Sequence, residues 1–271
     1  MATPRPITFL SDYGYEDEFA GVCRAVISQI APGAPLIDLS HGIGRQNVRQ
    51  GAIALANALP SCPPGVHLAV VDPGVGSARR AVAVTVSEGR FLVGPDNGVL
   101  SRALDRLGGA LEAVELSRSP FRLEPVSATF HGRDLFAPVA AHLALGARLD
   151  EAGESIDPGS LATLDLPAPR IGERAIVAHA IHEDGYGNVT LNLDASMIPD
   201  GPIGPGDALE IRAPDGRFDG VWARTFADVA PGDVLLFEDS SGALALAVSG
   251  GSAAGLMDLR PDREVTLRPL R

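Results

Sequence analysis

Short apolar runs alternate with stretches of helical periodicity from residue 6 to about residue 150. The runs are rich in β-branched residues, which is typical of buried strands, and the other stretches repeat their apolar residues every three to four positions. The strand-like runs are 6–11, 35–40, 65–71, 81–87 and 90–94, and the helical stretches are 16–32, 46–60, 97–109 and 134–147. This alternation predicts an α/β domain with a largely parallel sheet.

One pair of runs departs from the alternation. The segment AVAVTVSEGRFLVG places two strand-like runs on either side of a short Ser-Glu-Gly turn. No crossover helix fits between them, so we expect an antiparallel hairpin within or beside the sheet.

The pattern changes in the second half of the chain. Residues 156–172 are rich in Pro, Gly and acidic residues and show no sustained period, as expected of a linker. Six short strand-like runs follow, separated by turn sequences such as DGYGN and PDGR, with no convincing helix. We therefore predict an N-terminal α/β domain over 1–155, a linker over 156–172 and a small antiparallel β-barrel domain over 173–271.

Composition narrows the possible partners. The formal net charge of -12 argues against a nucleic-acid backbone as partner. No apolar stretch is long enough to span a bilayer, and the first residues lack the apolar region of an export signal, so a cytoplasmic protein is expected. Every basic residue is arginine, which excludes Schiff-base chemistry and a Walker lysine.

The sequence offers no convincing metal site. Cys23 and Cys62 are isolated and are predicted to be reduced structural thiols. His179 and His182 lie in one strand-like run, where their odd spacing sends them to opposite faces. We predict no metal site.

Polar residues follow three of the predicted strands. Asp12, His41 and Asp72 each come directly after an apolar run, where ligands bind at the carboxyl edge of a parallel sheet. Either aspartate could equally be an ordinary turn residue with no contact to a ligand. Asp17 precedes the first helix and is a candidate substrate ligand, although an acid there also stabilises the helix dipole.

A second segment rich in candidate functional residues is TFHGRDLFAP. His131 lies between Phe and Gly just before a predicted helix, a position suited to a cleft, and Gly132 allows close backbone approach. A purely structural role explains His131 equally well at this point.

Five motifs in chain order resemble one known family. They are FLSDYG, VVDPGVGSARR, LVGPDNGVL, TFHGRDLFAP and DGYGNVTLN. They look like those of the S-adenosyl-L-methionine hydroxide adenosyltransferases, which are related to the fluorinating and chlorinating adenosyl enzymes. The resemblance implies hydrolysis of S-adenosylmethionine to adenosine and L-methionine, with no cofactor. It also implies a homotrimer whose substrate lies between the N-terminal domain of one subunit and the C-terminal domain of its neighbour.

The resemblance also implies roles for individual residues. The catalytic trio would be Asp72, Arg79 and His131, and Asp12 would hold the ribose hydroxyls. Contacts to adenine or the methionine portion would come from the C-terminal domain residues Asp184, Asn188, Ser240 and Ser249. This chain has Ser249 where relatives usually have Asn, and the motif leaves open whether Arg79 or Arg80 faces the pocket.

Three other functions compete with hydrolysis. A halogenase would use fluoride or chloride, but halogenating members lack the Asp and Arg of the VVDPGVGSARR loop. A magnesium phosphohydrolase could use Asp12 and Asp72 and would lose activity with chelator. A non-catalytic nucleoside-binding module would bind without turnover, which the complete trio disfavours.

Overall fold

The computed structural model describes residues 3–270. The chain forms two compact units, Met1–Leu164 and Asp165–Arg271, which divide within the stretch that the sequence assigns to a linker.

Unit 1 is built on a seven-stranded sheet with the order β2-β1-β3-β5-β4-β6-β7. Its strands are β1 (Ile7–Ser11), β2 (Leu36–Ser40), β3 (Val66–Val70), β4 (Ala81–Thr85), β5 (Phe91–Pro95), β6 (Glu112–Glu115) and β7 (Glu154–Ile156). The first three strands and β5 run parallel, and β4 pairs antiparallel with β5, which confirms the predicted hairpin. The short strand β6 and the edge strand β7 were not predicted, because each is too short to show a period.

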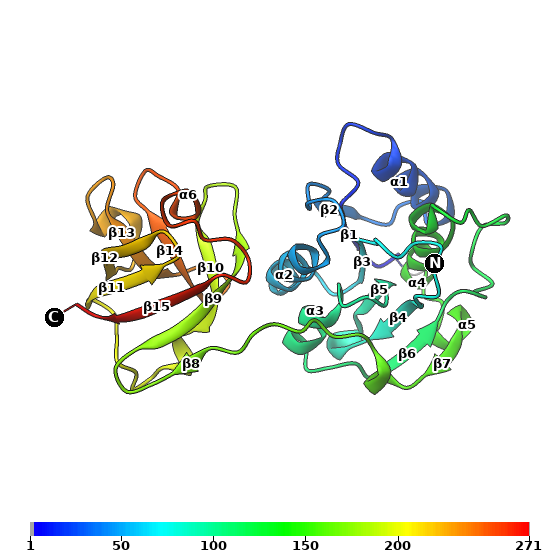
Figure 1. Ribbon diagram of the computed structural model, residues 1–271. Helices are drawn as coiled ribbons and strands as arrows, with labels where there is room; N and C mark the ends of the chain where they lie inside the picture. The colour runs from blue at the N-terminus through cyan, green and yellow to red at the C-terminus, as the bar shows by residue number, and fades with distance from the viewer. Residues whose placement is uncertain (1–2, 271) are drawn as a thin grey trace. The chain divides into compact units, whose positions relative to one another are not determined.

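Helices cover both faces of this sheet (Figure 1). They are α1 (Phe19–Ile30), α2 (Val48–Ala58), α3 (Ser101–Arg106), α4 (Ala137–Ala144) and α5 (Leu149–Ala152). Phe9 belongs to the core shared with α1 and α4, whereas the next residue, Leu10, belongs to the core shared with α2 and α3. Successive strand residues point to opposite faces, so burial of both faces explains the unbroken apolar runs.

Unit 2 is a closed β-barrel with a second core of its own. Its elements are β8 (Arg170–Ile171), β9 (Ile176–Glu183), β10 (Val189–Asp194), β11 (Ala208–Ala213), β12 (Gly216–Trp222), β13 (Val234–Glu238), β14 (Ala243–Val248), α6 (Ala253–Met257) and β15 (Glu264–Pro269). Pairing of β10 with β9 closes the ring, and β8 is added outside β9. The predicted barrel is confirmed, with α6, β8 and β15 in addition and one parallel pair, β12 with β13.

His179 and His182 lie on one strand, β9, as predicted, but the prediction that they point to opposite faces was wrong. The register of β9 against β10 shifts between Ala180 and His182, so an extra residue interrupts the alternation. Ala180 and Ile181 are both buried, while the two histidines are half-buried on either side of them. A bulge reverses the parity of side chains beyond it, which simple alternation cannot anticipate.

The described residues contain no helix with the length and apolar character needed to cross a bilayer.

Candidate active site

Arg79 binds both of the residues with which the motifs group it. Its Nε donates to Asp72 Oδ1 at 2.8 Å, and its Nη2 contacts Asp72 Oδ2. The same Nη2 lies 2.9 Å from His131 Nδ1. The side chains of Arg79 and Asp72 are only 10% and 7% exposed, so this ion pair is largely removed from water. The fold therefore brings Asp72, Arg79 and His131 into one cluster.

The loop after β3 is shaped to return Arg79 toward Asp72. Gly76 adopts a φ of +77°, and a Cβ there would lie 2.6 Å from the Ala128 carbonyl oxygen. A larger residue would be strained and would collide with the segment that leads to His131. Gly76 thus lets the arginine loop and the histidine segment pack against each other.

Arg80 has different partners. Its Nε donates to Asp96 Oδ2 at 2.8 Å, and its Nη1 donates to Ser160 Oγ at 2.9 Å. Arg80 thereby ties β4 to the segment that leaves unit 1. Of the two arginines, Arg79 is the one that faces His131.

The contact with Arg79 determines which nitrogen of His131 carries a proton. A guanidinium only donates, so Nδ1 of His131 must accept, and the neutral ring carries its proton on Nε2. Burial and the charge of Arg79 lower the pKa of His131, while Asp72 and Asp134 act in the opposite direction. The neutral imidazole therefore has Nε2–H available for a reactant oxygen.

Gly132 is required by a close aromatic contact. A Cβ at this position would lie 2.0 Å from the Tyr13 hydroxyl oxygen. Tyr13 is itself held by edge-on or tilted contacts with Phe9, Phe19 and Phe130. Burial raises the pKa of the Tyr13 phenol, so it stays neutral. The sequence reasoning missed this aromatic cluster, whose signal is the pair of motifs FLSDYG and TFHG.

Asp12 lies at the end of β1, half-buried, and accepts a hydrogen bond from the Gln46 backbone N–H at 2.7 Å. Burial raises the pKa of its carboxyl, and the Gln46 N–H partly offsets that effect. Asp72 is close enough to add a further small rise. Asp17 is exposed, before the start of α1 at Phe19, and the structure does not bring it into the cluster.

A cleft with a volume of about 450 Å³ reaches the cluster from the surface. Arg79, His131 and the buried Leu135 line it, with Ser117 and Arg122 also in its wall. Arg122 donates from Nε to Glu124 at 2.8 Å, just as Arg79 is paired with Asp72. The cationic groups of the cleft are therefore each balanced by a carboxylate.

Unit 2 gathers three of the remaining predicted residues around a cavity of about 820 Å³. Asp184, Asn188 and Ser240 line it, together with aromatic side chains that include Tyr186 and Phe237. One oxygen of Asp184 accepts the backbone N–H groups of Tyr186 and Asn188, at 2.8 and 2.9 Å. The other accepts Asn188 Nδ2 at 2.8 Å. Asp184 thus shapes the turn that presents Asn188. The sequence reasoning did not single out the aromatic lining.

Ser249 is not part of that lining. It follows β14, and its backbone bonds to Gly232 and Asp233. The adjacent Gly250 does line the cavity, so Ser249 is a neighbour of the site.

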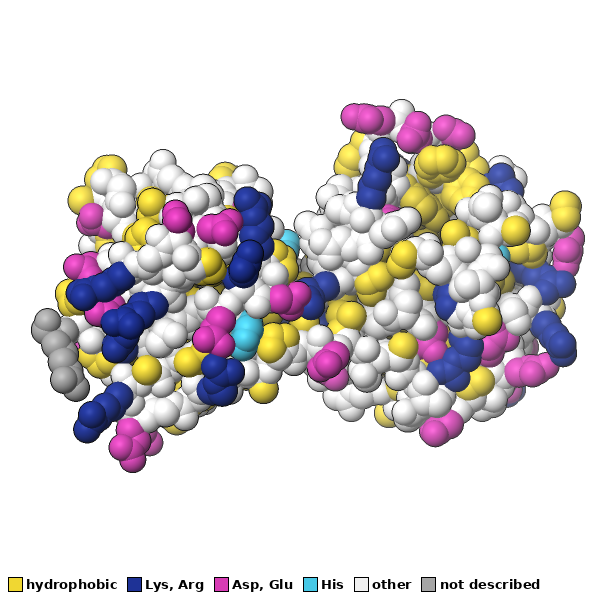
Figure 2. Space-filling model, viewed as in Figure 1, with side chains coloured by type: hydrophobic (Ala, Val, Ile, Leu, Met, Phe, Trp, Pro, Cys, Tyr) yellow, Lys and Arg dark blue, Asp and Glu magenta, His cyan; other side chains and the backbone are white. Residues whose placement is uncertain are grey.

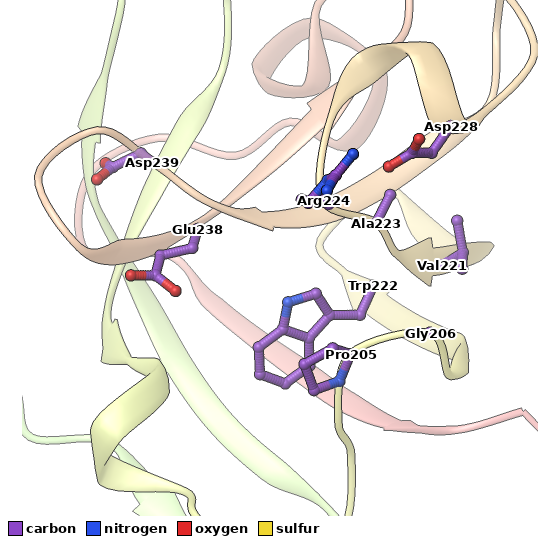
Figure 3. Close-up of a pocket in the computed structure, with 9 residues that line it drawn as sticks. All are labelled: Pro205, Gly206, Val221, Trp222, Ala223, Arg224, Asp228, Glu238 and Asp239. Carbon is purple, nitrogen blue, oxygen red and sulfur yellow. The ribbon is translucent and has the colours of Figure 1, made fainter.

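A separate cavity of about 650 Å³ in unit 2 contains the only tryptophan of the chain. Figure 3 shows the Trp222 ring below Glu238, with Arg224 and Asp228 above the ring. Asp239 lines both this cavity and the one at Asp184, and none of the predicted site residues lies here.

Residues 3–270 contain no group of three or more His, Cys, Asp or Glu side chains placed to hold a metal ion.

Two family models match this chain. The SAM hydroxide adenosyltransferase N-terminal domain matches residues 7–153, and the corresponding C-terminal domain matches residues 178–266. The chain belongs to this family. The N-terminal model covers the whole Asp72–Arg79–His131 cluster, and the C-terminal model covers the Asp184 turn.

Curated proteins similar to this chain include hydrolases and fluorinases. An (R)-S-adenosyl-L-methionine hydrolase from Salinispora tropica is 45% identical over 261 residues, covering 96% of this chain and 97% of that protein. One from Thermus thermophilus is 38% identical and covers 97% and 99%. A fluorinase from Actinoplanes sp. is 27% identical and covers 96% of each chain. Among solved structures, an uncharacterised conserved protein from Thermotoga maritima superposes with a TM-score of 0.91 at 33% identity, covering 97% of this chain and 99% of that one.

Proposed function

We propose that this protein hydrolyses S-adenosyl-L-methionine to adenosine and L-methionine. The observation that carries the proposal is the guanidinium of Arg79, bound at once to Asp72 and to His131. The hydrolases among the relatives are also more similar, at 45% and 38% identity, than the fluorinase at 27%.

The reaction joins a water oxygen to C5′ of the ribose and breaks the C5′–S bond. The bonding electron pair goes to sulfur, which leaves as the neutral thioether of methionine, and one water proton is released. The leaving group needs no acid, so the catalytic task is to stabilise hydroxide character in the nucleophile. Arg79 supplies positive charge, Nε2–H of His131 donates to the oxygen, and Asp72 orients Arg79. No cofactor is required.

The balanced charges of the cleft favour water as the nucleophile. Arg79 and Arg122 are each paired with a carboxylate, whose charge opposes entry of a halide anion but not of neutral water. The hydroxide character that Arg79 stabilises develops only after the water is in place. The inner end of the cleft, beside Arg79 and His131, is our proposed position for the reacting water.

The substrate is held by groups from both domains. Asp12 binds the ribose hydroxyls, and Asp17 is a further proposed contact to the substrate. Asp184, Asn188, Ser240 and Ser249 contact or support adenine and the methionine portion. The substrate lies between the N-terminal domain of one subunit and the C-terminal domain of its neighbour in a cytoplasmic homotrimer.

Exposed aromatic residues support this assembly. Tyr15 in the Asp12 loop is 71% exposed, and Tyr186 in the Asp184 turn is 85% exposed. Figure 2 shows hydrophobic side chains at the surface over α1, beside acidic side chains of the preceding loop. Aromatic residues are enriched at subunit interfaces, so burial against a neighbour would account for both tyrosines. Sedimentation velocity tests the trimer.

The names of the relatives specify the R configuration at sulfur, and we extend this preference to the present chain. The decisive experiment incubates the protein separately with each sulfonium epimer, with and without chelator, fluoride or chloride. Adenosine and methionine in equal amounts are expected, unaffected by chelator, and faster from the R epimer. Absence of adenosine under all conditions contradicts hydrolysis, and 5′-haloadenosine as the main product would identify a halogenase.

A further inference from the structure

His41 is almost completely buried although it follows β2 at the ligand-binding edge of the sheet. Its side chain is 1% exposed. The imidazole was expected to face a ligand, and that expectation was wrong, because the ring turns inward and packs edge-on against Phe9. A buried polar ring needs partners for its nitrogens, and those partners indicate what the residue does.

Two bonds from His41 hold the loop that carries Asp12. Nδ1 lies 2.7 Å from the Ser11 hydroxyl, and the His41 carbonyl accepts the Gly14 N–H at 2.7 Å. Ser11 Oγ also accepts the Tyr13 N–H at 3.3 Å. The residues directly before and after Asp12 are therefore anchored to one side chain, either directly or through Ser11.

The second ring nitrogen of His41, Nε2, lies near a carboxylate, that of Asp38. Nε2 lies 3.3 Å from Asp38 Oδ1, which favours the ring proton on Nε2, and Asp38 pairs with Arg24 of α1 at 2.9 Å. With that tautomer, the Ser11 hydroxyl donates to His41 Nδ1 while its oxygen accepts the Tyr13 N–H. Nε2 and Asp38 Oδ1 are both buried without a well-formed hydrogen bond, so the ring depends mainly on its bond to Ser11.

We propose that His41 is a positioning residue, which acts through Ser11 to hold Asp12 where it meets the ribose hydroxyls. Ser11 is fully buried, so this Ser–His–Asp chain has no nucleophile that a substrate can reach. The inference rests on the ribose-binding role of Asp12 in the proposed function.

The test compares two buried histidines of unit 1, His41 after β2 and His67 within β3. His67 is 0% exposed and bonds to Thr8 at the start of β1, whereas His41 bonds to Ser11 at its end. His41→Asn and His67→Asn should both lower the free energy of unfolding. Only His41→Asn should raise KM, by about 10-fold, with kcat within about threefold of the wild type.

A binding measurement separates positioning from general damage. The affinity for adenosine is compared with that for 2′,3′-dideoxyadenosine by calorimetry. The wild type and His67→Asn should prefer adenosine, and His41→Asn should lose most of this preference. Ser11→Ala should show the same loss. It tests the positioning role in place of His41→Asn if that variant does not fold.

An undiminished preference in folded His41→Asn or Ser11→Ala overturns the inference, as does an equal loss in His67→Asn. The binding measurement needs no turnover, so it reads the positioning even if hydrolysis fails in the assay above. If Asp12→Asn leaves the preference intact, the ribose-binding role of Asp12 is contradicted, and this inference falls with it.

Discussion

Arg79 and Arg80 are adjacent in the chain, yet their guanidinium groups bind different carboxylates, those of Asp72 and Asp96. Arg79 also contacts His131, while Arg80 reaches Ser160 near the end of unit 1. Of two arginines in one motif, Arg79 thus lies in the candidate active site, and Arg80 stabilises the fold.

This division predicts different phenotypes for two matched substitutions. Arg79→Met should lower kcat by about 100-fold or more, because the charge that stabilises the nucleophile is lost. Arg80→Met should keep most of the turnover but lower the free energy of unfolding by about 1–3 kcal/mol, since it leaves Asp96 without its charged partner. Adenosine release and urea unfolding measure the two effects. Equal loss of turnover in both variants would contradict the assignment.

Gly132→Ala should destabilise the protein through the Tyr13 hydroxyl. The added Cβ would lie 2.0 Å from that oxygen but 3.0 Å from the ring carbon that bears it. We expect a loss of about 1–3 kcal/mol in unfolding free energy for Gly132→Ala, typical of overpacking. Combining it with Tyr13→Phe should recover much of that loss, because the colliding atom is removed. A double-mutant cycle by urea unfolding checks this, and purely additive effects would argue against the contact.

The turnover should fall in acid as His131 becomes protonated. Protonation places an N–H on Nδ1 against the Nη2–H of Arg79, so the neutral ring is the active form. The pKa of His131 in the free protein is lowered from the ordinary value of 6.5, so the midpoint of the acid limb in kcat/KM should lie below 6.5. A kcat/KM profile from about pH 5 to about pH 8 measures it. His142→Gln should leave the midpoint unchanged, and a wild-type midpoint above 6.5 would contradict this prediction.

His67 should make stability depend on pH. Burial, assisted by the charge of Arg90, lowers its pKa to about 4 from the ordinary 6.5. The folded state therefore binds fewer protons than the unfolded state in this range, and stability falls as the pH drops from 6.5 toward 4. The full loss of unfolding free energy from this pKa difference is about 3 kcal/mol. Urea unfolding at about pH 7 and about pH 4.5 should show a smaller acid loss in His67→Asn than in the wild type. An equal loss in both would show that His67 does not titrate in this range.

The main elements of the fold could be predicted because their patterns reflect burial. Strands β1, β3 and β5 are buried on both faces and appear as unbroken apolar runs, while α1 and α2 show helical periods. The short strands β6, β7 and β8 could not be predicted, since two to four residues carry no period. The prediction of which face each side chain of β9 points to failed at the bulge for a related reason. An inserted residue leaves no signal in the local pattern of apolar and polar positions.

The sequence by itself determined the two-domain class and, through its motifs, the set of residues from which the candidate site is built. The tertiary structure decided which of those residues meet. Arg79 was selected over Arg80, and His41 was turned inward to Ser11, by contacts between segments distant in the chain. Local patterns reflect the periods of helices and strands and the burial of each face. Which polar groups pair depends instead on loop geometry such as that at Gly76, and only the folded chain specifies it.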